Sequence, residues 1–253
     1  MFCRFRAGLA VTGLVLAIFL ATRAPQAQAP AQFTNLQYFP KTISRDELIG
    51  VMRRFCFSLN VRCQYCHAAT EKDQNFASDE KETKRTARNM LRMVDGINQN
   101  YIAKLGRTTS TKVECVTCHH GLNIPRTMDG LLAETLEKKD IPAAIAQYRD
   151  LRKKAYGYGQ YDFGETPLNQ LAENLLKQHK TKEAVAIMEL NVDVNTPPSG
   201  WSYSVLAMAH QANQETEKAK ADYRKILELN PQNDWAKKQL EELNNPSNSR
   251  RDK

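Results

Sequence analysis

The sequence predicts an all-α protein made of two helical parts, and three observations lead to this fold class. Apolar residues recur at i, i+3 and i+4 along residues 48–59 and again along residues 78–105, which is the helical period. From about residue 126 onward, similar residues return after about 34 positions, a spacing typical of stacked helix pairs. Charged residues make up 25% and hydrophobic residues 42% of the 253 positions, a composition that argues against disorder.

The first 31 residues have the pattern of an export signal. Residues 1–6 carry two arginines and no acid, and residues 7–21 form an uncharged, mostly apolar run. A basic start followed by about 15 apolar residues matches a secretory signal better than a full membrane span. We expect cleavage before Gln32, and the alternative is a short N-terminal anchor that is never cut. Both predict that the remaining chain lies in the periplasm or on the periplasmic face of the inner membrane.

The first helix of the mature chain is expected to begin at Ser44. Residues 44–47 read Ser-Arg-Asp-Glu, the pattern of a capping box in which the serine and the glutamate satisfy each other's backbone N–H groups. Met52 lies on the apolar stripe of this helix, and it is the only methionine between residue 32 and the first cysteine motif. The stripe consists of Leu48, Val51, Met52, Phe55, Cys56 and Leu59. Cys56 is expected to be a buried, inert thiol.

A second helix is expected from Ser78 to about Leu105. Its apolar arc consists of Ala87, Met90, Val94, Ile97, Tyr101 and Leu105. At about 100° per residue, Met90 lies about 20° from the middle of this arc and Met93 about 80° from it. Both methionines are candidate ligands, and the angle favours Met90.

Two short motifs carry the chemistry. Residues 63–67 read Cys-Gln-Tyr-Cys-His and residues 115–119 read Cys-Val-Thr-Cys-His, which is twice the attachment signature of c-type haem. Each thiol of a motif forms a thioether with one porphyrin vinyl group, and the histidine that follows lies under the iron as its proximal ligand. The sequence therefore predicts two covalent haem c groups, one on Cys63, Cys66 and His67 and one on Cys115, Cys118 and His119. His120 is expected to be a surface residue or to lie just outside the ligand set.

Three other interpretations of the cysteines explain less. A four-cysteine zinc site has a much shorter gap between its pairs and needs no histidine after each pair. A redox dithiol needs a strand–helix context and one motif only. Structural disulfides suit an exported protein but leave both histidines unexplained.

The stretch from Leu48 to Gly121 resembles the cytochrome c subunit of photosynthetic reaction centres. The resemblance rests on Met52 eleven positions before Cys63, on residues 75–79 (Asn-Phe-Ala-Ser-Asp), 87–93 (Ala-Arg-Asn-Met-Leu-Arg-Met), 97–98 (Ile-Asn) and 116–121 (Val-Thr-Cys-His-His-Gly). In that family each unit is a helix with an axial methionine, then a turn, then the Cys-x-x-Cys-His motif. The resemblance implies that Met52 ligates the first iron and Met90 the second, and that the chain is a dihaem electron carrier. Members of the family in reaction centres typically carry four haems, whereas this chain has two motifs.

The second part of the chain has the pattern of tetratricopeptide-like repeats. One copy lies within residues 202–231, a weaker one precedes residues 197–198, and a degenerate one begins near Leu131. The positions that carry the pattern are Tyr203, Leu206, Ala207, Ala219, Tyr223 and Pro231; Leu168, Leu171, Ala172, Ala184 and Met188; and Leu131, Ala144 and Tyr148. Residues 233–243 are expected to form a closing helix. Arrays of this kind bind protein segments in a concave groove, so a peptide or protein is an expected partner. His179 and His210 are expected to be solvent-facing or packing residues.

These patterns together predict four segments and one function. Residues 1–31 are the signal peptide or anchor, 32–125 a dihaem cytochrome c domain, 126–245 a tetratricopeptide-like helical domain and 246–253 a polar tail. The expected function is one-electron transfer between protein redox partners, with a photosynthetic reaction centre or another membrane electron-transfer complex among them, and not enzyme catalysis. The alternatives are a dihaem peroxidase-like oxidoreductase, which needs one displaceable sixth ligand, and a repeat-based scaffold with accessory haems.

The net charge of +8 is distributed unevenly along the chain. Residues 1–31 carry three arginines and no acid, residues 32–125 carry 14 basic and 9 acidic side chains, and residues 126–253 carry 19 of each. Part of the positive excess thus leaves with the signal, and the haem propionates offset much of the rest. The charge therefore does not indicate a nucleic-acid partner; it favours basic side chains near the haems that steer an acidic redox partner.

Overall fold

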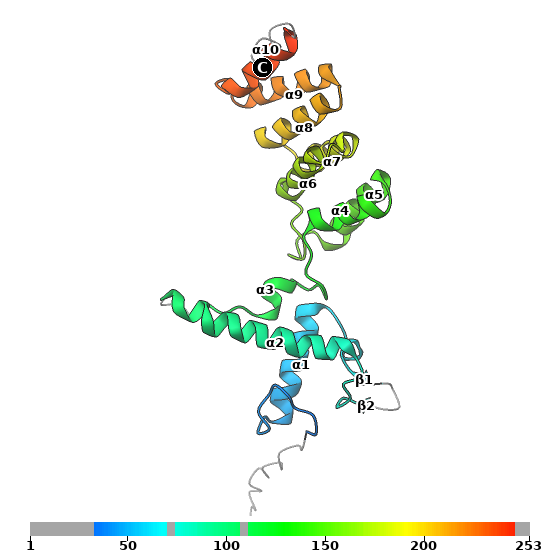
Figure 1. Cartoon of the computed structure of the whole chain (residues 1–253), viewed down its shortest axis with the longest axis vertical. Helices are drawn as coiled ribbons and strands as arrows, with labels where there is room; N and C mark the ends of the chain where they lie inside the picture. Colours follow the sequence, from blue (N-terminus) through cyan, green and yellow to red (C-terminus); the bar gives the residue numbers. More distant parts are fainter. Residues whose placement is uncertain (1–32, 70–73, 107–110, 246–253) are drawn as a thin grey trace, which may run out of the picture.

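The computed structural model describes residues 33–69, 74–106 and 111–245, and the predicted signal and polar tail lie outside these ranges. The all-α prediction is confirmed: apart from a two-stranded ribbon of two residues per strand, the described elements are helical (Figure 1). The N-terminal part contains α1 (Arg45–Leu59), η1 (Cys63–Tyr65), β1 (Ala68–Ala69), β2 (Gln74–Asn75), α2 (Glu82–Asn100), η2 (Ile102–Leu105) and α3 (Cys115–His119). The C-terminal part contains α4 (Met128–Lys138), α5 (Ile141–Ala155), α6 (Glu165–Lys177), α7 (Thr181–Val194), α8 (Gly200–Ala212), α9 (Thr216–Leu229) and α10 (Asp234–Asn244).

Helix α1 begins and ends with the caps that its sequence dictates. The predicted capping box is present: Ser44 Oγ accepts the N–H of Glu47 at 3.2 Å, and Glu47 Oε2 accepts the N–H of Ser44 at 3.1 Å. At the other end Asn60 adopts the left-handed conformation, with φ of 52°, and its N–H donates to carbonyls of the last turn. Asparagine tolerates this conformation better than most residues, so the chain turns sharply here.

Helix α2 begins later than its apolar period predicts, at Glu82 instead of Ser78. The carbonyl groups of residues 76–78 accept hydrogen bonds from the Lys84 ammonium, and those of residues 79 and 80 accept from the Arg85 guanidinium. Because these carbonyls are bound to side chains of the following helix, residues 76–80 form a loop around two cations. The helix then runs to Asn100, and its chain continues as the short turn η2.

The C-terminal part is a stack of three helical hairpins, α4–α5, α6–α7 and α8–α9, closed by α10 (Figure 1). Helices α4, α6 and α8 pack side by side in one layer, and α5 packs against α7 in the other. Most positions that define the sequence repeat lie in the core, as expected for residues that join one hairpin to the next. The largest fully buried side chains are Tyr148, Tyr223, Met128, Leu132, Leu168, Ile187, Met188 and Ile226. In the first hairpin Leu132 fills the core, whereas Leu131 is only partly buried.

For the two histidines of the C-terminal part, the expectation is correct for His179 and incomplete for His210. His179 is exposed at the turn after α6. His210 on α8 is 4% exposed, and its Nδ1 lies 2.6 Å from the carboxylate of Asp222 on α9. It is a buried polar residue that joins two helices, because a buried imidazole needs a partner for its ring nitrogens.

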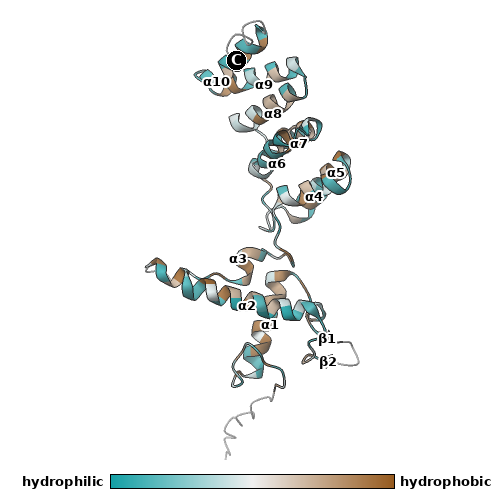
Figure 2. Cartoon of the chain, viewed as in Figure 1, coloured by the Kyte–Doolittle hydropathy of each residue, from teal (hydrophilic) through white to brown (hydrophobic). Residues whose placement is uncertain are grey.

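The two parts of the molecule bury apolar surface very differently. The buried hydrophobic side chains of the described residues all lie between Met128 and Ala236. Helices α1 and α2 carry hydrophobic residues (Figure 2), and none of the hydrophobic side chains of these two helices is buried. Within the described ranges, no helix has the length and the apolar character needed to cross a membrane.

Candidate haem-binding site

The first cysteine motif lies directly after the turn that ends α1. Residues 63–65 form the 3₁₀ turn η1, and the carbonyl of Cys63 accepts the N–H groups of Cys66 at 3.2 Å and of His67 at 3.0 Å. This tight turn places both cysteines and the histidine on one short segment of backbone. Cys63 is exposed and Cys66 is half-buried.

The first turn of α2 fastens this motif from the other side. Thr83 Oγ1 donates to the carbonyl of Tyr65 at 2.5 Å, and the Lys81 ammonium donates to the carbonyl of Gln64. Both acceptors belong to the two residues between the cysteines. The motif is therefore held by its own turn and by a helix that begins 15 residues after it.

The ring of His67 is oriented by a backbone carbonyl. Its Nδ1 lies 3.1 Å from the carbonyl oxygen of Phe76, and the Phe76 ring stands edge-on to it with the ring centres 5.2 Å apart. Because Nδ1 donates its proton there, Nε2 is the nitrogen left for a metal, the arrangement typical of a ligand histidine. Burial lowers the pKa of His67, and the nearby cations of Lys84, Arg88 and Lys81 add to this effect against the Phe76 hydrogen bond. The neutral imidazole, the form that binds metals, is favoured.

The second motif forms the short helix α3, and its histidine has the same orientation. His119 Nδ1 lies 2.8 Å from the carbonyl oxygen of Leu122, while the Leu122 N–H donates to the carbonyl of His119 at 2.7 Å. The turn that allows this exchange needs two left-handed residues, His120 with φ of 48° and Gly121 with φ of 78°. His120 is exposed, as expected from the sequence.

A pair of hydrogen bonds from α2 positions the chain that enters the second motif. Asn98 Nδ2 donates to the carbonyl of Val113 at 2.8 Å, and Asn98 Oδ1 accepts the Val113 N–H at 2.8 Å. The side-chain amide thus pairs with the backbone of Val113 as a neighbouring strand would. Helix α2 fastens the first motif at its beginning and the second motif near its end.

The two motifs are also neighbours in space. The Gly121 N–H donates to the carbonyl of Ser58 in the last turn of α1 at 3.0 Å, and Asn123 Nδ2 lies 3.5 Å from the hydroxyl of Tyr65. Gln160, in the loop between α5 and α6, donates to the carbonyl of Gly121 at 3.2 Å. The turn after the second motif therefore contacts the helix before the first motif and the C-terminal part.

The five described cysteines lie in different surroundings. Burial raises the pKa of Cys66 and of Cys115, so these two thiols hold their protons more firmly. Cys56 is half-buried instead of buried as expected; burial raises its pKa first, and the neighbouring Cys63 thiol adds to the shift. Among the described residues, no group of three or more His, Cys, Asp and Glu side chains is arranged to hold a metal ion.

The methionine candidates remain predictions. Met52 is half-buried on α1, whereas Met90 is 40% exposed and Met93 is 48% exposed on α2. This small difference in exposure does not distinguish Met90 from Met93. The periodicity of α2 and the resemblance of residues 87–93 are still the reasons for preferring Met90.

The residues that surround both motifs fit a haem group. Two oriented histidines each have a free Nε2, two cysteine pairs lie on short turns, and several apolar side chains of the same N-terminal part are exposed. The exposed members of this apolar set are Phe57, Phe76, Met90, Met93, Tyr101, Leu105 and Val116. A porphyrin is a large apolar plane, and burial of such a surface against these side chains is favourable.

This donor set on an all-helical framework defines a c-type cytochrome. Comparison with known proteins agrees: a family model described as photosynthetic reaction centre cytochrome C subunit matches residues 24–212, and the chain belongs to this family. Membership implies covalently bound haem c. The match reaches past the cysteine motifs to the end of α8, so it includes two of the helical hairpins.

Two curated relatives are similar to parts of the chain. Cytochrome c-554 of Chloroflexus aurantiacus is 37% identical over 125 residues, which cover 46% of this chain and 29% of that protein. The photosynthetic reaction center cytochrome c subunit of Roseobacter denitrificans is 28% identical over 212 residues, which cover 74% of this chain and 53% of that protein. The matched regions thus span about half or less of the length of these relatives.

Sequence reasoning found the ligand candidates but missed the residues that orient them. Neither the Phe76 nor the Leu122 carbonyl has a side-chain signal in the sequence, because any residue supplies a carbonyl. In the sequence, Asn98 contributes only to the family resemblance, through residues 97–98. A polar residue at the border of the apolar arc of α2, one position after Ile97, is the signal that its amide has a partner.

Proposed function

We propose that this protein is a one-electron carrier that holds two covalent haem c groups. Cys63 and Cys66 attach the first group and Cys115 and Cys118 the second. His67 and His119 are the proximal iron ligands through Nε2. The observation that carries this proposal is the paired geometry of the histidines, each of which follows a cysteine pair and donates Nδ1–H to a backbone carbonyl.

The chain's own residues prepare both sites for electron transfer. When bound, haem supplies an iron that changes between the ferric and ferrous states by one electron. The carbonyls of Phe76 and Leu122 keep each imidazole in one tautomer and one orientation, so the ligand geometry need not change between the two states. The hydrogen bond of Gly121, after the second motif, with Ser58, before the first motif, brings the two sites into one unit, which supports transfer from one to the other.

We assign Met52 as the sixth ligand of the first iron and Met90 as that of the second. With these thioether ligands, a bound iron would have no open position for a substrate, which favours a carrier over a peroxidase. The test is carbon monoxide binding to the reduced protein. The wild type should not bind it, Met52→Ala and Met90→Ala should each open one iron, and Met93→Ala should behave as the wild type. Ready binding by the wild type would contradict the carrier function.

We further propose four segments and an exported location. They are a signal or anchor over residues 1–31, a dihaem domain over 32–125, a tetratricopeptide-like domain over 126–245 and a polar tail over 246–253. Donor and acceptor are proteins in the periplasm or at its membrane face, and a photosynthetic reaction centre is one candidate because a relative carries that name. Flash oxidation of a reaction centre mixed with the reduced protein measures this directly: re-reduction that speeds up with protein concentration is expected.

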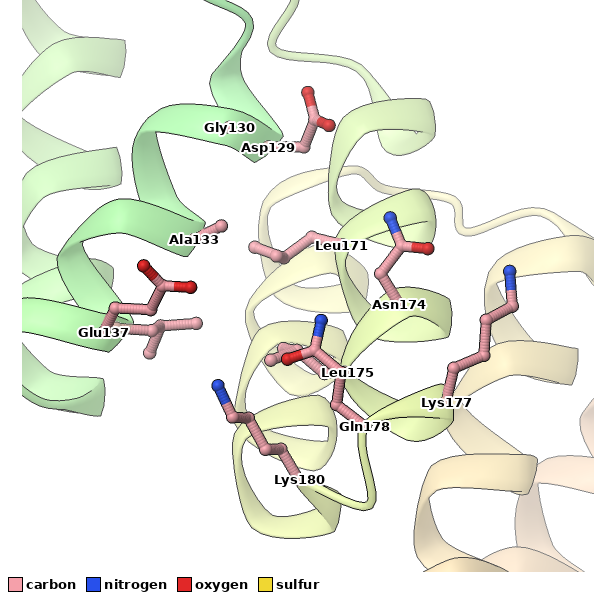
Figure 3. A pocket seen from close by; sticks show the side chains of 11 residues that line it. Asp129, Gly130, Ala133, Glu137, Leu171, Asn174, Leu175, Lys177, Gln178 and Lys180 are labelled. Carbon is pink, nitrogen blue, oxygen red and sulfur yellow. The ribbon is translucent and has the colours of Figure 1, made fainter.

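The repeat is proposed to bind a segment of a partner protein between α4 and α6. Figure 3 shows this groove, with Asp129 and Glu137 on the α4 side and Lys177 and Lys180 on the other. Charged side chains of both signs surround an apolar floor that includes Leu171. A photocrosslinker at Lys177 should capture the redox partner. The same group at Lys154, on the outer helix α5, should not capture it, and equal capture from both positions would contradict the proposal.

A further inference from the structure

Lys84 stands apart from every other residue in the N-terminal part. Between residues 33 and 127, it is the one buried residue among those whose side chains the structure describes, with 9% of its surface exposed. A lysine is rarely buried unless its charge has partners, because removing an ammonium from water is costly. The reason for burying this one must lie in what its ammonium contacts.

Oxygen atoms surround the Lys84 ammonium. Nζ donates to the carbonyls of Phe76 at 2.8 Å, Ala77 at 3.0 Å and Ser78 at 2.7 Å, which uses its three N–H groups. The carboxylate of Asp79 lies 3.2 Å away and also pairs with Arg88 at 2.8 Å. The hydrogen bond from Asn35 first, and these two cations next, hold the pKa of Asp79 well below its usual value, so the carboxylate is charged.

One of these carbonyls is the acceptor that orients the first candidate ligand. The Phe76 oxygen accepts from Lys84 Nζ at 2.8 Å and from His67 Nδ1 at 3.1 Å. At the second motif, the Leu122 oxygen accepts from His119 Nδ1 at 2.8 Å, and no other side-chain donor among the described residues reaches it. The two sites thus share their histidine–carbonyl contact and differ in whether a cation shares the carbonyl.

We propose that Lys84 is a positioning residue that raises the reduction potential of the haem ligated by His67, and leaves that of the haem ligated by His119 unchanged. The proposal rests on the proposed function, since it needs His67 to be an iron ligand. It adds a built-in difference between two sites whose motifs are otherwise alike.

Two effects of Lys84 act in the same direction. A carbonyl that also binds an ammonium has less electron density for the imidazole, so His67 keeps its Nδ1 proton more fully and donates less charge to the iron. Outer hydrogen bonds of this kind are known to set the basicity of a ligand histidine. The positive charge itself also disfavours the additional positive charge of ferric iron, and its burial limits screening by water and salt. Both effects favour the ferrous state.

The test compares three variants of the haem-loaded protein by potentiometric titration. Lys84→Met keeps the length of the side chain and removes the charge and the donors. It should lower the equilibrium constant for reduction of the haem ligated by His67 by about tenfold, which lowers its reduction potential by about 59 mV. A tenfold change is the lower end of the effect of removing a residue that supports a metal ligand. Lys84→Arg retains charge and donors, so it should keep more than half of the wild-type effect.

Lys81→Met is the matched control. Lys81 lies three residues before Lys84, and its ammonium binds the Gln64 carbonyl within the same motif without reaching Phe76. Its removal should change the constant by less than about threefold, because Lys81 is less buried than Lys84 and water and salt screen its charge more strongly. Equal shifts from Lys81→Met and Lys84→Met would contradict the proposal, as would a Lys84→Met protein that unfolds more easily while neither potential moves.

A measurement on the wild type keeps the proposal testable even if Lys84→Met fails to fold. In the reduced, diamagnetic protein, the Nδ1–H proton of His67 should resonate upfield of that of His119 after correction for ring currents, since its hydrogen bond is weaker. Equal positions, or the reverse order, would overturn the proposal. Absence of haem on Cys63 and Cys66 would instead overturn the proposed function, so the two failures are distinguishable.

Discussion

Replacing Asn98 with alanine tests whether α2 holds the second motif in place. The amide makes two hydrogen bonds of 2.8 Å with the backbone of Val113, and alanine removes both. A typical intramolecular hydrogen bond contributes about 0.5–1.5 kcal/mol net, so the pair stabilises the fold by about 1–3 kcal/mol. Because Val113 is half-buried, water replaces part of the two lost hydrogen bonds. We therefore expect the free energy of unfolding to fall by about 2 kcal/mol.

Urea unfolding of the haem-loaded protein, followed by its visible absorbance, measures this loss. With a denaturant slope of about 2 kcal/mol per molar, the midpoint should fall by about 1 M. Asn100→Ala is the control, since Asn100 is an exposed asparagine in the last turn of the same helix. A midpoint shift no larger than that of Asn100→Ala would refute the idea that Asn98 fastens the second motif.

Four further predictions concern other contacts. The pKa of Asp79 is lowered, so its contribution to stability is present at neutral pH and is lost progressively as the pH falls below about 4. The wild-type protein should therefore lose more stability between pH 7 and pH 3 than Asp79→Asn does, and the shift in urea midpoint measures this loss. Leu132→Ala should lower the free energy of unfolding by about 2–5 kcal/mol, because Leu132 is fully buried. Leu229→Ala, at an exposed position, should lower it by less than about 0.5 kcal/mol. Urea unfolding followed by far-ultraviolet circular dichroism measures both. His210→Leu removes the hydrogen bond to the Asp222 carboxylate and should lower the free energy of unfolding by about 1–3 kcal/mol in the same assay. Electron-transfer rates with an acidic partner should fall steeply as salt increases, and rates indifferent to salt would contradict electrostatic steering.

The regular elements could be predicted because local signals specify them. The capping box at Ser44 begins α1 where the sequence indicates, and the repeat positions Leu168, Ala172 and Ala184 lie in the core. These signals act within one turn of helix or one repeat, so a single sequence contains them in full. The closing helix is likewise where it was expected, with Asn233 as its N-cap.

What the sequence could not predict depends on contacts between distant segments. Helix α2 begins at Glu82 and not at the predicted Ser78, because side chains of the helix donate hydrogen bonds to the carbonyls before it. Apolar periodicity does not describe such contacts. A helical pattern predicts that Lys84 is a solvent-exposed charge. Only the fold shows that Lys84 is buried and that its ammonium donates to three carbonyls. The pairing of His210 with Asp222 spans two helices, and no spacing rule indicates it.

In the candidate site, too, local sequence signals predict some features, and contacts between distant segments determine the others. The cysteines and histidines of both motifs are candidates that the sequence alone supplies, because thioether and iron chemistry demand those residues at that spacing. The carbonyls that orient the histidines, and the asparagine that holds the second motif, follow from how α2 lies against the chain. The choice of Met90 over Met93 still depends on helix periodicity, since both side chains are similarly exposed.

The most direct test of the central claim is the mass of the exported protein together with its visible spectrum. The account predicts the mass of the processed or anchored chain plus two haem groups, retained after denaturation, and the spectrum of low-spin haem c. Cys63→Ser combined with Cys66→Ser should remove one group, and Cys115→Ser combined with Cys118→Ser the other. A wild-type mass without two added haems would contradict the account.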